Sequence, residues 1–385
     1  MTPFVFNTAA SIQFGAGKIA ELGGIVRARM RGRVLLITDP GLVELGMVAR
    51  AIEILENVGV PVSVFANVQA DPPESVIEEA VAVAKDLDVQ GIVGLGGGSS
   101  LDVAKLVAVL ALGTETLDGM FGVGNTKGPR LPLILIPTTS GTGSEVTMVS
   151  IVTTGKSEKM GVVSPVILPD VALLDPELTY GLPPHITAAT GIDAMVHAIE
   201  AYASLSANNN PLSRSLACEA LRLMGATLER AVHDGGDKAA RADMLLGSML
   251  AGQAFANSPV AAVHALAYPI GGHFKVPHGL SNALVLPHVL RFNAATSPKP
   301  YAEIASYAFP HILGDGPQIM ALNFAQEMED LSKRCGLQQG LREVGIGRDD
   351  LPMMAQDAMN QTRLLVNNPR KVDEAAALAI YEAAY

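Results

Sequence analysis

The pattern of apolar residues changes near residue 183, and this change constrains the fold more than any other feature of the chain. Before it, short apolar runs alternate with segments of helical periodicity. The pattern predicts strands at 33–39, 61–67, 91–97 and 131–138, and helices at 43–59, 74–88 and 100–113. Strands that alternate with helices over short links pair in parallel, and continuously apolar strands are buried on both faces. This half therefore predicts a doubly wound parallel α/β sheet.

After residue 183 the strand-like runs disappear, and helical patterns follow one another. They predict helices at 187–204, 212–233, 239–256, 279–294, 319–335 and 373–384. The break falls at Pro183 and Pro184, which end the preceding element. A length of 385 residues also exceeds that of one typical domain. We therefore predict an α/β domain over residues 1–182 and an all-helical domain over residues 183–385.

Composition and charge exclude several classes of protein. The chain is 49% hydrophobic and 17% charged, which is typical of a folded core rather than of disorder. A net charge of −11 argues against binding to nucleic acid or to an anionic membrane surface. The N-terminus lacks the pattern of a signal peptide, and no apolar stretch is long enough to cross a bilayer. The two cysteines are isolated and give no disulfide framework, which is typical of a cytoplasmic protein.

Three histidines and one aspartate in the second half have spacings suited to a metal site. Asp193 and His197 are four residues apart, so on a helix they share one face. His264 and His278 are separated by a stretch with two prolines and two glycines. Because no single helix should run through that stretch, we expect the chain to bend and return both imidazoles to one place. Three neutral imidazoles and a carboxylate suit Fe(II) or Zn(II).

Two polar loops in the first half are suited to a dinucleotide. Residues 94–102, GLGGGSSLD, join a strand to a helix, where close backbone approach and the first helical N–H groups favour a phosphate. The segment is neither a P-loop nor a complete GxGxxG motif, and a tight turn in which Ser99 caps the helix and Asp102 completes a capping box is an open alternative. Residues 136–147, IPTTSGTGSEVT, offer hydroxyls for ribose and phosphate, or form a hydroxyl-rich surface turn.

Asp39 lies at the end of the strand predicted at 33–39. An acid there accepts a hydrogen bond from a ribose 2′-hydroxyl and repels a 2′-phosphate, which favours NAD over NADP. A turn-forming role before Pro40 explains the residue equally well. A metal site together with a dinucleotide site predicts a dehydrogenase.

With both halves considered, the chain resembles the iron-containing (group III) alcohol dehydrogenase family. The resemblance covers essentially the whole chain and rests on GGGSSLDVAK, PTTSGTGSEVT, ATGIDAMVHAIEAY, HALAYPIGGHFKVPHG and NNPR, in this order. It implies an α/β dinucleotide-binding domain followed by an all-helical metal-binding domain. It also implies hydride transfer between a small primary alcohol, diol or hydroxy acid and NAD, with Fe(II), or alternatively Zn(II), as the metal. The family further implies a homodimer or a larger homo-oligomer.

The resemblance also implies roles for particular residues. It places the metal ligands on Asp193, His197, His264 and His278. It places the cofactor contacts on Asp39, Asp71, Gly96, Gly97, Gly98, Ser99, Asp102, Thr138, Thr139, Thr142, Lys159 and Leu178.

Tyr268 departs from the family pattern. Many relatives carry a histidine four residues after the third ligand, where it is proposed to help move protons, and this chain has Tyr268 there. A phenol, with a pKa of about 10, carries protons less well than imidazole near neutral pH. We expect Tyr268 to act beside His264 and His278 as a hydrogen-bond donor to substrate, unless water and the cofactor ribose form the relay. His273 is a less favoured substitute, because a histidine beside two glycines is typical of a loop.

Three other functions stay open at this point. A metal-independent reductase related to maleylacetate reductases shares the fold but has a different ligand set. A lyase similar to dehydroquinate synthase needs several basic residues near the ligands, where Lys275 is the nearest. A scaffold protein without chemistry predicts broken ligands. The intact ligand set favours the dehydrogenase. Phe255, Tyr268 and Phe274 either line an apolar substrate pocket or pack in the core.

Overall fold

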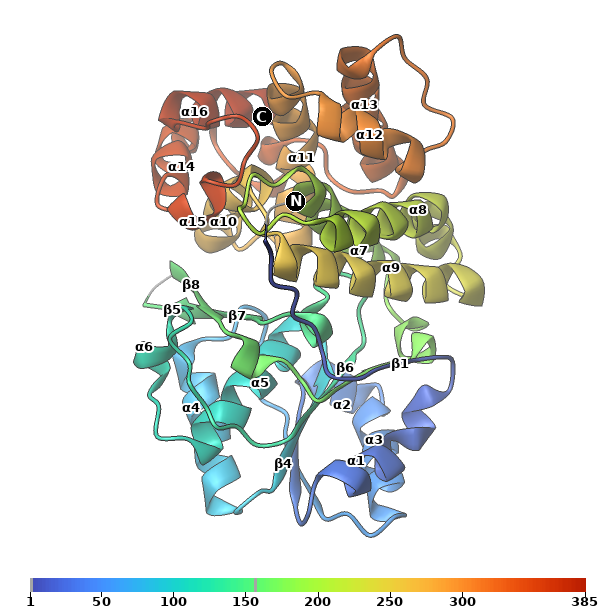
Figure 1. Ribbon diagram of the computed structural model, residues 1–385, viewed down its shortest axis with the longest axis vertical. Helices are drawn as coiled ribbons and strands as arrows, with labels where there is room; N and C mark the ends of the chain where they lie inside the picture. The colour runs from blue at the N-terminus through green and yellow to red at the C-terminus, as the bar shows by residue number, and fades with distance from the viewer. Residues whose placement is uncertain (1–2, 156–157) are drawn as a thin grey trace. The chain divides into compact units, whose positions relative to one another are not determined.

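The structure is a computed structural model that describes residues 3–155 and 158–385 (Figure 1). The chain divides into two compact units. An α/β unit comprises Asn7–Thr139 and Gly143–Tyr180. A helical unit comprises Gly181–Tyr385 together with residues 3–6 and the short segment Ser140–Thr142.

A six-stranded, fully parallel sheet forms the centre of the α/β unit. In spatial order its strands are β1 (Ile12–Phe14), β9 (Val171–Leu174), β6 (Leu133–Pro137), β4 (Gly91–Gly96), β2 (Val34–Ile37) and β3 (Val62–Phe65). The central strands β2, β4, β6 and β9 are buried at every residue, as their continuous apolar sequences require. The predicted doubly wound sheet is confirmed.

Two apolar clusters cover the two faces of this sheet, because successive strand residues point to opposite sides. Leu35 and Ile37 join the helices α4 (Glu74–Asp86) and α5 (Gly98–Leu112) in one cluster. Val34 and Leu36 join the helices α1 (Leu22–Arg29) and α3 (Met47–Glu56) in the other. Figure 1 shows these helix pairs on either side of the strands.

Several details of the α/β unit differ from the sequence prediction. The strands β1 and β9 and the helix α1 were not predicted. The helix expected over 43–59 is two helices, α2 (Pro40–Glu44) and α3, because Gly46 between them adopts a left-handed conformation. A small second sheet of β5 (Gly122–Val123), β8 (Glu158–Val163) and β7 (Val149–Thr154) was not expected. Its longer strands lack a continuous apolar run, since burial alternates along β7. The unit also contains α6 (Leu117–Met120) and the short 3₁₀ turns η1 (Lys18–Glu21), η2 (Ser144–Val146), η3 (Pro165–Ile167) and η4 (Pro176–Thr179).

Every regular element described in the helical unit is a helix, which confirms the predicted all-helical domain. The elements are α7 (Pro184–Ala203), α8 (Pro211–His233), α9 (Lys238–Asn257), α10 (Ala262–Phe274), α11 (His278–Ala294), α12 (Lys299–Ala308), α13 (Pro317–Arg334), η5 (Leu341–Val344), η6 (Arg348–Asp350), α14 (Leu351–Ala358), α15 (Thr362–Leu365) and α16 (Glu374–Ala383). A single large apolar core joins most of them. Within the described residues, no helix combines the length and the apolar character needed to cross a membrane.

Helix α10 was not predicted, because Pro269 and the Gly271–Gly272 pair discourage a helix. The structure continues the helix through Pro269 and ends it at Lys275, which has a φ of 58°. Helix α11 begins three residues later, after Pro277. The expected bend between His264 and His278 is therefore present but short. The expectation that His273 lies in a loop was wrong, since it lies in the last turn of α10.

Candidate active site

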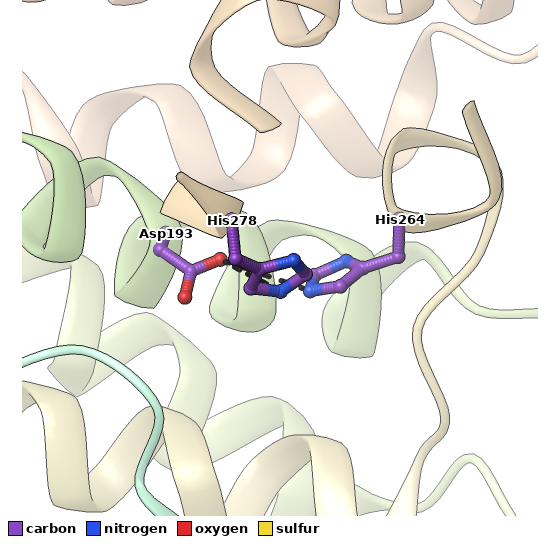
Figure 2. Close-up of side chains that lie close together, drawn as sticks. All are labelled: Asp193, His264 and His278. Atoms are coloured by element: carbon purple, nitrogen blue, oxygen red, sulfur yellow. Dashed lines mark ion pairs between the residues drawn. The ribbon is translucent and has the colours of Figure 1, made fainter. Parts of the chain in front are cut away.

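Three of the four expected metal ligands converge in the helical unit. One ligand atom each from Asp193, His264 and His278 lies within 4.8 Å of the other two. The Nε2 atoms of His264 and His278 lie 3.8 Å and 3.7 Å from Asp193 Oδ1. The three side chains come from the separate helices α7, α10 and α11 and point toward one another (Figure 2). One carboxylate and two imidazole nitrogens directed at one point suit a divalent cation.

The charge state of Asp193 also suits a metal ligand. Burial alone would raise the pKa of this carboxyl, but the imidazoles of His197, His278 and His264 and the Asn282 amide outweigh it. The pKa of Asp193 therefore stays below its ordinary value, and the side chain is a carboxylate at neutral pH.

His197, the fourth expected ligand, lies beside the cluster of three. Its ring is stacked between those of Phe255 and His264, at centroid distances of 4.3 Å and 4.8 Å. Within the described residues its buried Nδ1 has no hydrogen-bond partner. Burial lowers the pKa of His197 to about 3, so the imidazole is neutral. A neutral, buried imidazole beside the cluster fits a ligand role, which stays a prediction.

Asn282 belongs to this site and was missed at the sequence level. Its amide Nδ2 lies 2.6 Å from Asp193 Oδ1, 3.3 Å from His264 Nε2 and 3.4 Å from His278 Nε2. An electropositive amide group thus faces the point on which the three acceptors converge. Its position one helical turn after His278, on the same face of α11, was the available signal.

The structure separates the two candidates for proton transfer. The Tyr268 ring lies 6.2 Å from the His278 ring, within an apolar group that includes Phe255 and Leu365. The Nε2 of His273 instead lies 2.9 Å from the Asp357 carboxylate. Of the three residues considered for a pocket wall, Phe255 and Tyr268 therefore share a group near the ligands. Phe274 packs against the main helical core.

The glycine-rich turn in the α/β unit joins β4 to α5. The helix starts at Gly98 after Gly97, and no side chain caps it, so the alternative of a Ser99 cap with an Asp102 capping box is wrong. A Cβ at Gly96 would lie 2.7 Å from the Ser100 side chain and 3.3 Å from Asp39 Oδ2. The backbone thus needs glycine there. The uncapped N–H groups at the start of α5 are suited to an anion such as a pyrophosphate.

Asp39 lies beside this turn. Its Oδ1 accepts a hydrogen bond from the Leu42 N–H at 3.2 Å and so caps α2, which agrees with the turn-forming interpretation. Its Oδ2 accepts from the Ser100 hydroxyl at 3.4 Å. Because strands β2 and β4 are neighbours, the carboxylate lies next to the glycine-rich turn. A residue that distinguishes NAD from NADP at the ribose must lie there.

Asp102 faces the interior of the α/β unit. It accepts hydrogen bonds from Ser144 Oγ at 2.6 Å and from the Ile151 N–H at 2.9 Å. The fully buried Lys105, one turn later, lies 3.5 Å from the same carboxylate. Lys105 was missed at the sequence level, although a lysine within the apolar helix α5 was a usable signal.

The other predicted cofactor residues lie at several places. Thr138 follows β6 and donates its N–H to the Gly96 carbonyl at 3.0 Å, and Thr139 lies beside Gly97. Lys159 on β8 forms an ion pair with Asp71. Leu178 is buried in η4. Thr142 belongs to the helical unit.

Both halves of the chain match models of one protein family. The model described as "Iron-containing alcohol dehydrogenase" matches residues 9–176. The model described as "Fe-containing alcohol dehydrogenase family, C-terminal" matches residues 187–385.

Individual relatives match along almost the whole chain. The long-chain-alcohol dehydrogenase 1 of Geobacillus thermodenitrificans is 41% identical over 379 residues, which cover 96% of this chain and 94% of that protein. The crystal structure of a 1,3-propanediol oxidoreductase matches with a TM-score of 0.95 and 34% identity, over 100% of both chains. The sulfoacetaldehyde reductase of Bifidobacterium kashiwanohense, solved in complex with NAD⁺, matches with a TM-score of 0.88 and 29% identity, over 100% of this chain and 99% of that one.

The parallel sheet, the all-helical unit and the ligand cluster define a metal-dependent, NAD-linked oxidoreductase that interconverts alcohols and aldehydes. The chain belongs to the iron-containing alcohol dehydrogenase family.

Proposed function

We propose that the protein transfers hydride reversibly between a small primary alcohol and NAD, at a divalent metal held by Asp193, His197, His264 and His278. The observation that carries this proposal is the convergence of Asp193, His264 and His278 from three helices. The metal-independent reductase has a different ligand set, so this convergence also favours the dehydrogenase. A bound cation would supply Lewis-acid stabilisation of the negative charge on the substrate oxygen.

We propose Fe(II) as the native metal, with Zn(II) as the alternative. Family membership supports iron, whereas Zn(II) binds nitrogen and oxygen ligands of this kind more tightly than Fe(II) does. Neutral His197 and ionised Asp193 are ready to bind either cation without first losing a proton.

For the cofactor, we propose that Gly96, Gly97, Gly98 and Ser99 hold the pyrophosphate at the start of α5. Thr138, Thr139 and Thr142 would contact the ribose and nicotinamide, with further contacts from Asp71, Asp102, Lys159 and Leu178. The tight backbone at Gly96 supports the pyrophosphate site. The carboxylate of Asp39 beside that turn supports NAD rather than NADP.

The substrate class follows from the residues beside the ligands. Phe255 stacks on His197, and Tyr268 lies near His278 within the same apolar group. Such a wall favours short alcohols, diols or hydroxy acids with an apolar carbon chain. We propose that the Tyr268 hydroxyl donates a hydrogen bond to the substrate. We further propose that the protein is cytoplasmic and forms a homodimer or a larger homo-oligomer. Within each chain, we propose that the boundary between the two domains lies between residues 182 and 183.

Metal removal tests the proposed function. The purified enzyme would be stripped with a chelator, and NADH formation from a panel of short alcohols would be followed with added Fe(II), Zn(II) or no metal. We expect activity to be lost on removal and restored by a metal. His264→Ala should abolish activity, whereas the matched variant His311→Ala, at an exposed histidine of the same unit, should keep it. Undiminished activity in verified metal-free enzyme would overturn the proposal.

A further inference from the structure

We infer that Glu200 is a positioning residue for the metal site, an inference that rests on the proposed function. Its carboxylate fixes which nitrogen of His264 faces the metal, and it holds the start of the helix that carries His264. Glu200 was not among the expected site residues. It lies on α7, three residues after His197, and is 5% exposed.

Glu200 uses both of its oxygens on the start of α10. Its Oε2 lies 2.7 Å from His264 Nδ1. Its Oε1 accepts a hydrogen bond from the Val263 backbone N–H, also at 2.7 Å. A carboxylate with one oxygen on a ligand and the other on the adjacent backbone holds both in one geometry.

The first contact determines the tautomer of His264. A carboxylate accepts hydrogen bonds and cannot donate them, so Nδ1 of the neutral ring must carry the proton. The lone pair is then on Nε2, which is the atom that lies 3.8 Å from Asp193 Oδ1. Such a carboxylate also fixes the orientation of the ring and increases the basicity of the ligand nitrogen.

The second contact caps α10 from another helix. Ala261, at the N-cap position, has no side-chain acceptor for the first N–H groups of the helix. Glu200 provides that acceptor for Val263, and its negative charge is favourable at a helix N-terminus. The position of His264 in the first turn of α10 therefore depends on a residue of α7.

The substitution Glu200→Gln tests this role, because it keeps the shape while its single amide oxygen can accept from only one of the two donors. We would measure the Zn(II) affinity of the folded variant by competition with a chromophoric chelator. We expect affinity to fall roughly 10- to 100-fold, as is usual when an outer partner of a metal-binding histidine is lost. The matched control is Glu303→Gln, at a glutamate of the same unit that accepts from the Tyr202 hydroxyl at 2.9 Å.

A second measurement uses the wild-type enzyme and does not depend on how the variant folds. In ¹⁵N-histidine-labelled, Zn(II)-loaded protein, NMR should show His264 with a protonated Nδ1 and a metal-bound Nε2. A metal-bound Nδ1 would overturn the inference. So would a folded Glu200→Gln variant whose affinity stays within about twofold of wild type. Failure of the wild type to bind Zn(II) and Fe(II) would instead overturn the proposed metal site, and this inference with it.

Discussion

The buried ammonium group of Lys105 lies 2.7 Å from the hydroxyl of Ser144, and this contact ties helix α5 to the segment that follows the sheet strand β6. The same Nζ donates to Thr147 Oγ1 at 3.1 Å and to the Val149 carbonyl at 2.8 Å. One fully buried lysine therefore joins the helix of the glycine-rich turn to the second predicted cofactor loop.

Replacing Lys105 with methionine should destabilise the α/β unit. The change leaves the buried hydroxyls of Ser144 and Thr147 and the partly buried carbonyl of Val149 without their common donor. It also leaves the Asp102 carboxylate without its counter-ion. We expect the free energy of unfolding to fall by roughly 3 kcal/mol in urea titrations. Lys85→Met, at an exposed lysine of the same unit, is the control and should change little. A Lys105→Met protein as stable as the control would contradict this assignment.

Glu145 should make stability depend on pH. Burial raises the pKa of this carboxyl to about 7, partly offset by a backbone hydrogen bond and by Lys105. The folded protein thus holds a proton that the unfolded chain releases near its ordinary value of 4.5, so stability falls as pH rises through about 7. At about 1.4 kcal/mol for each pKa unit, the rise from 4.5 to about 7 makes this loss at most about 3.5 kcal/mol.

Glu145→Gln should remove this part of the pH dependence. Unfolding free energies of wild type and variant would be compared at pH 5 and pH 8, with Glu79→Gln on the exposed side of α4 as the control. We expect the variant to lose less stability between the two pH values than wild type does. Equal losses would show that Glu145 does not bind the proton.

Gly279 lies where α11 packs tightly against α7 beside the ligands. A Cβ there would lie 2.3 Å from the Ala189 carbonyl oxygen, so alanine would push α11 away and displace the adjacent His278 from Asp193. We expect Gly279→Ala to weaken metal binding roughly tenfold or more, which is the loss seen when an outer partner that orients a metal ligand is mutated. Gly24→Ala is the control, because a Cβ at that helical glycine meets no atom within 4 Å. Unchanged metal affinity in Gly279→Ala would show that the close approach does not set the site.

Asp39 should determine the choice of coenzyme. Asp39→Ser keeps a side chain that can cap α2 but removes the charge that would repel a 2′-phosphate. We expect the ratio of kcat/KM for NADP to that for NAD to rise about tenfold or more. One charge contact at this position contributes roughly 1.4 kcal/mol or more, which corresponds to a tenfold change in kcat/KM. The measurement is a pair of saturation curves with the two coenzymes. An unchanged ratio would leave Asp39 as a turn residue alone.

Four of the six strands of the central sheet and most of the longer helices could be predicted from sequence, because their signals are local. The apolar runs of β2, β4 and β6 are long enough to identify buried parallel strands. Helix α10 was missed because the local cost of Pro269 and two glycines is overcome by packing that is remote in sequence. The antiparallel pair of β7 and β8 was missed because burial alternates along β7 instead of running continuously.

The sequence predicted that Asp193, His264 and His278 converge, but not which side chains contact them. Histidine and aspartate spacing, together with the family motifs, made these three residues candidate ligands. Glu200 and Asn282 act on these ligands from positions 64 and 18 residues away from His264. A single sequence does not reveal which polar residue packs against which ligand, so such contacts emerged only from the fold.

Anomalous diffraction at the iron edge, from crystals of the Fe(II)-loaded enzyme, would test the four-ligand metal site directly. We predict one anomalous peak per chain, bound by Asp193, His197, His264 and His278 at roughly 2.0–2.3 Å. A peak bound by these four side chains would establish the complete ligand set, including His197. A metal bound elsewhere, or a peak that His197 does not contact, would contradict the four-ligand site.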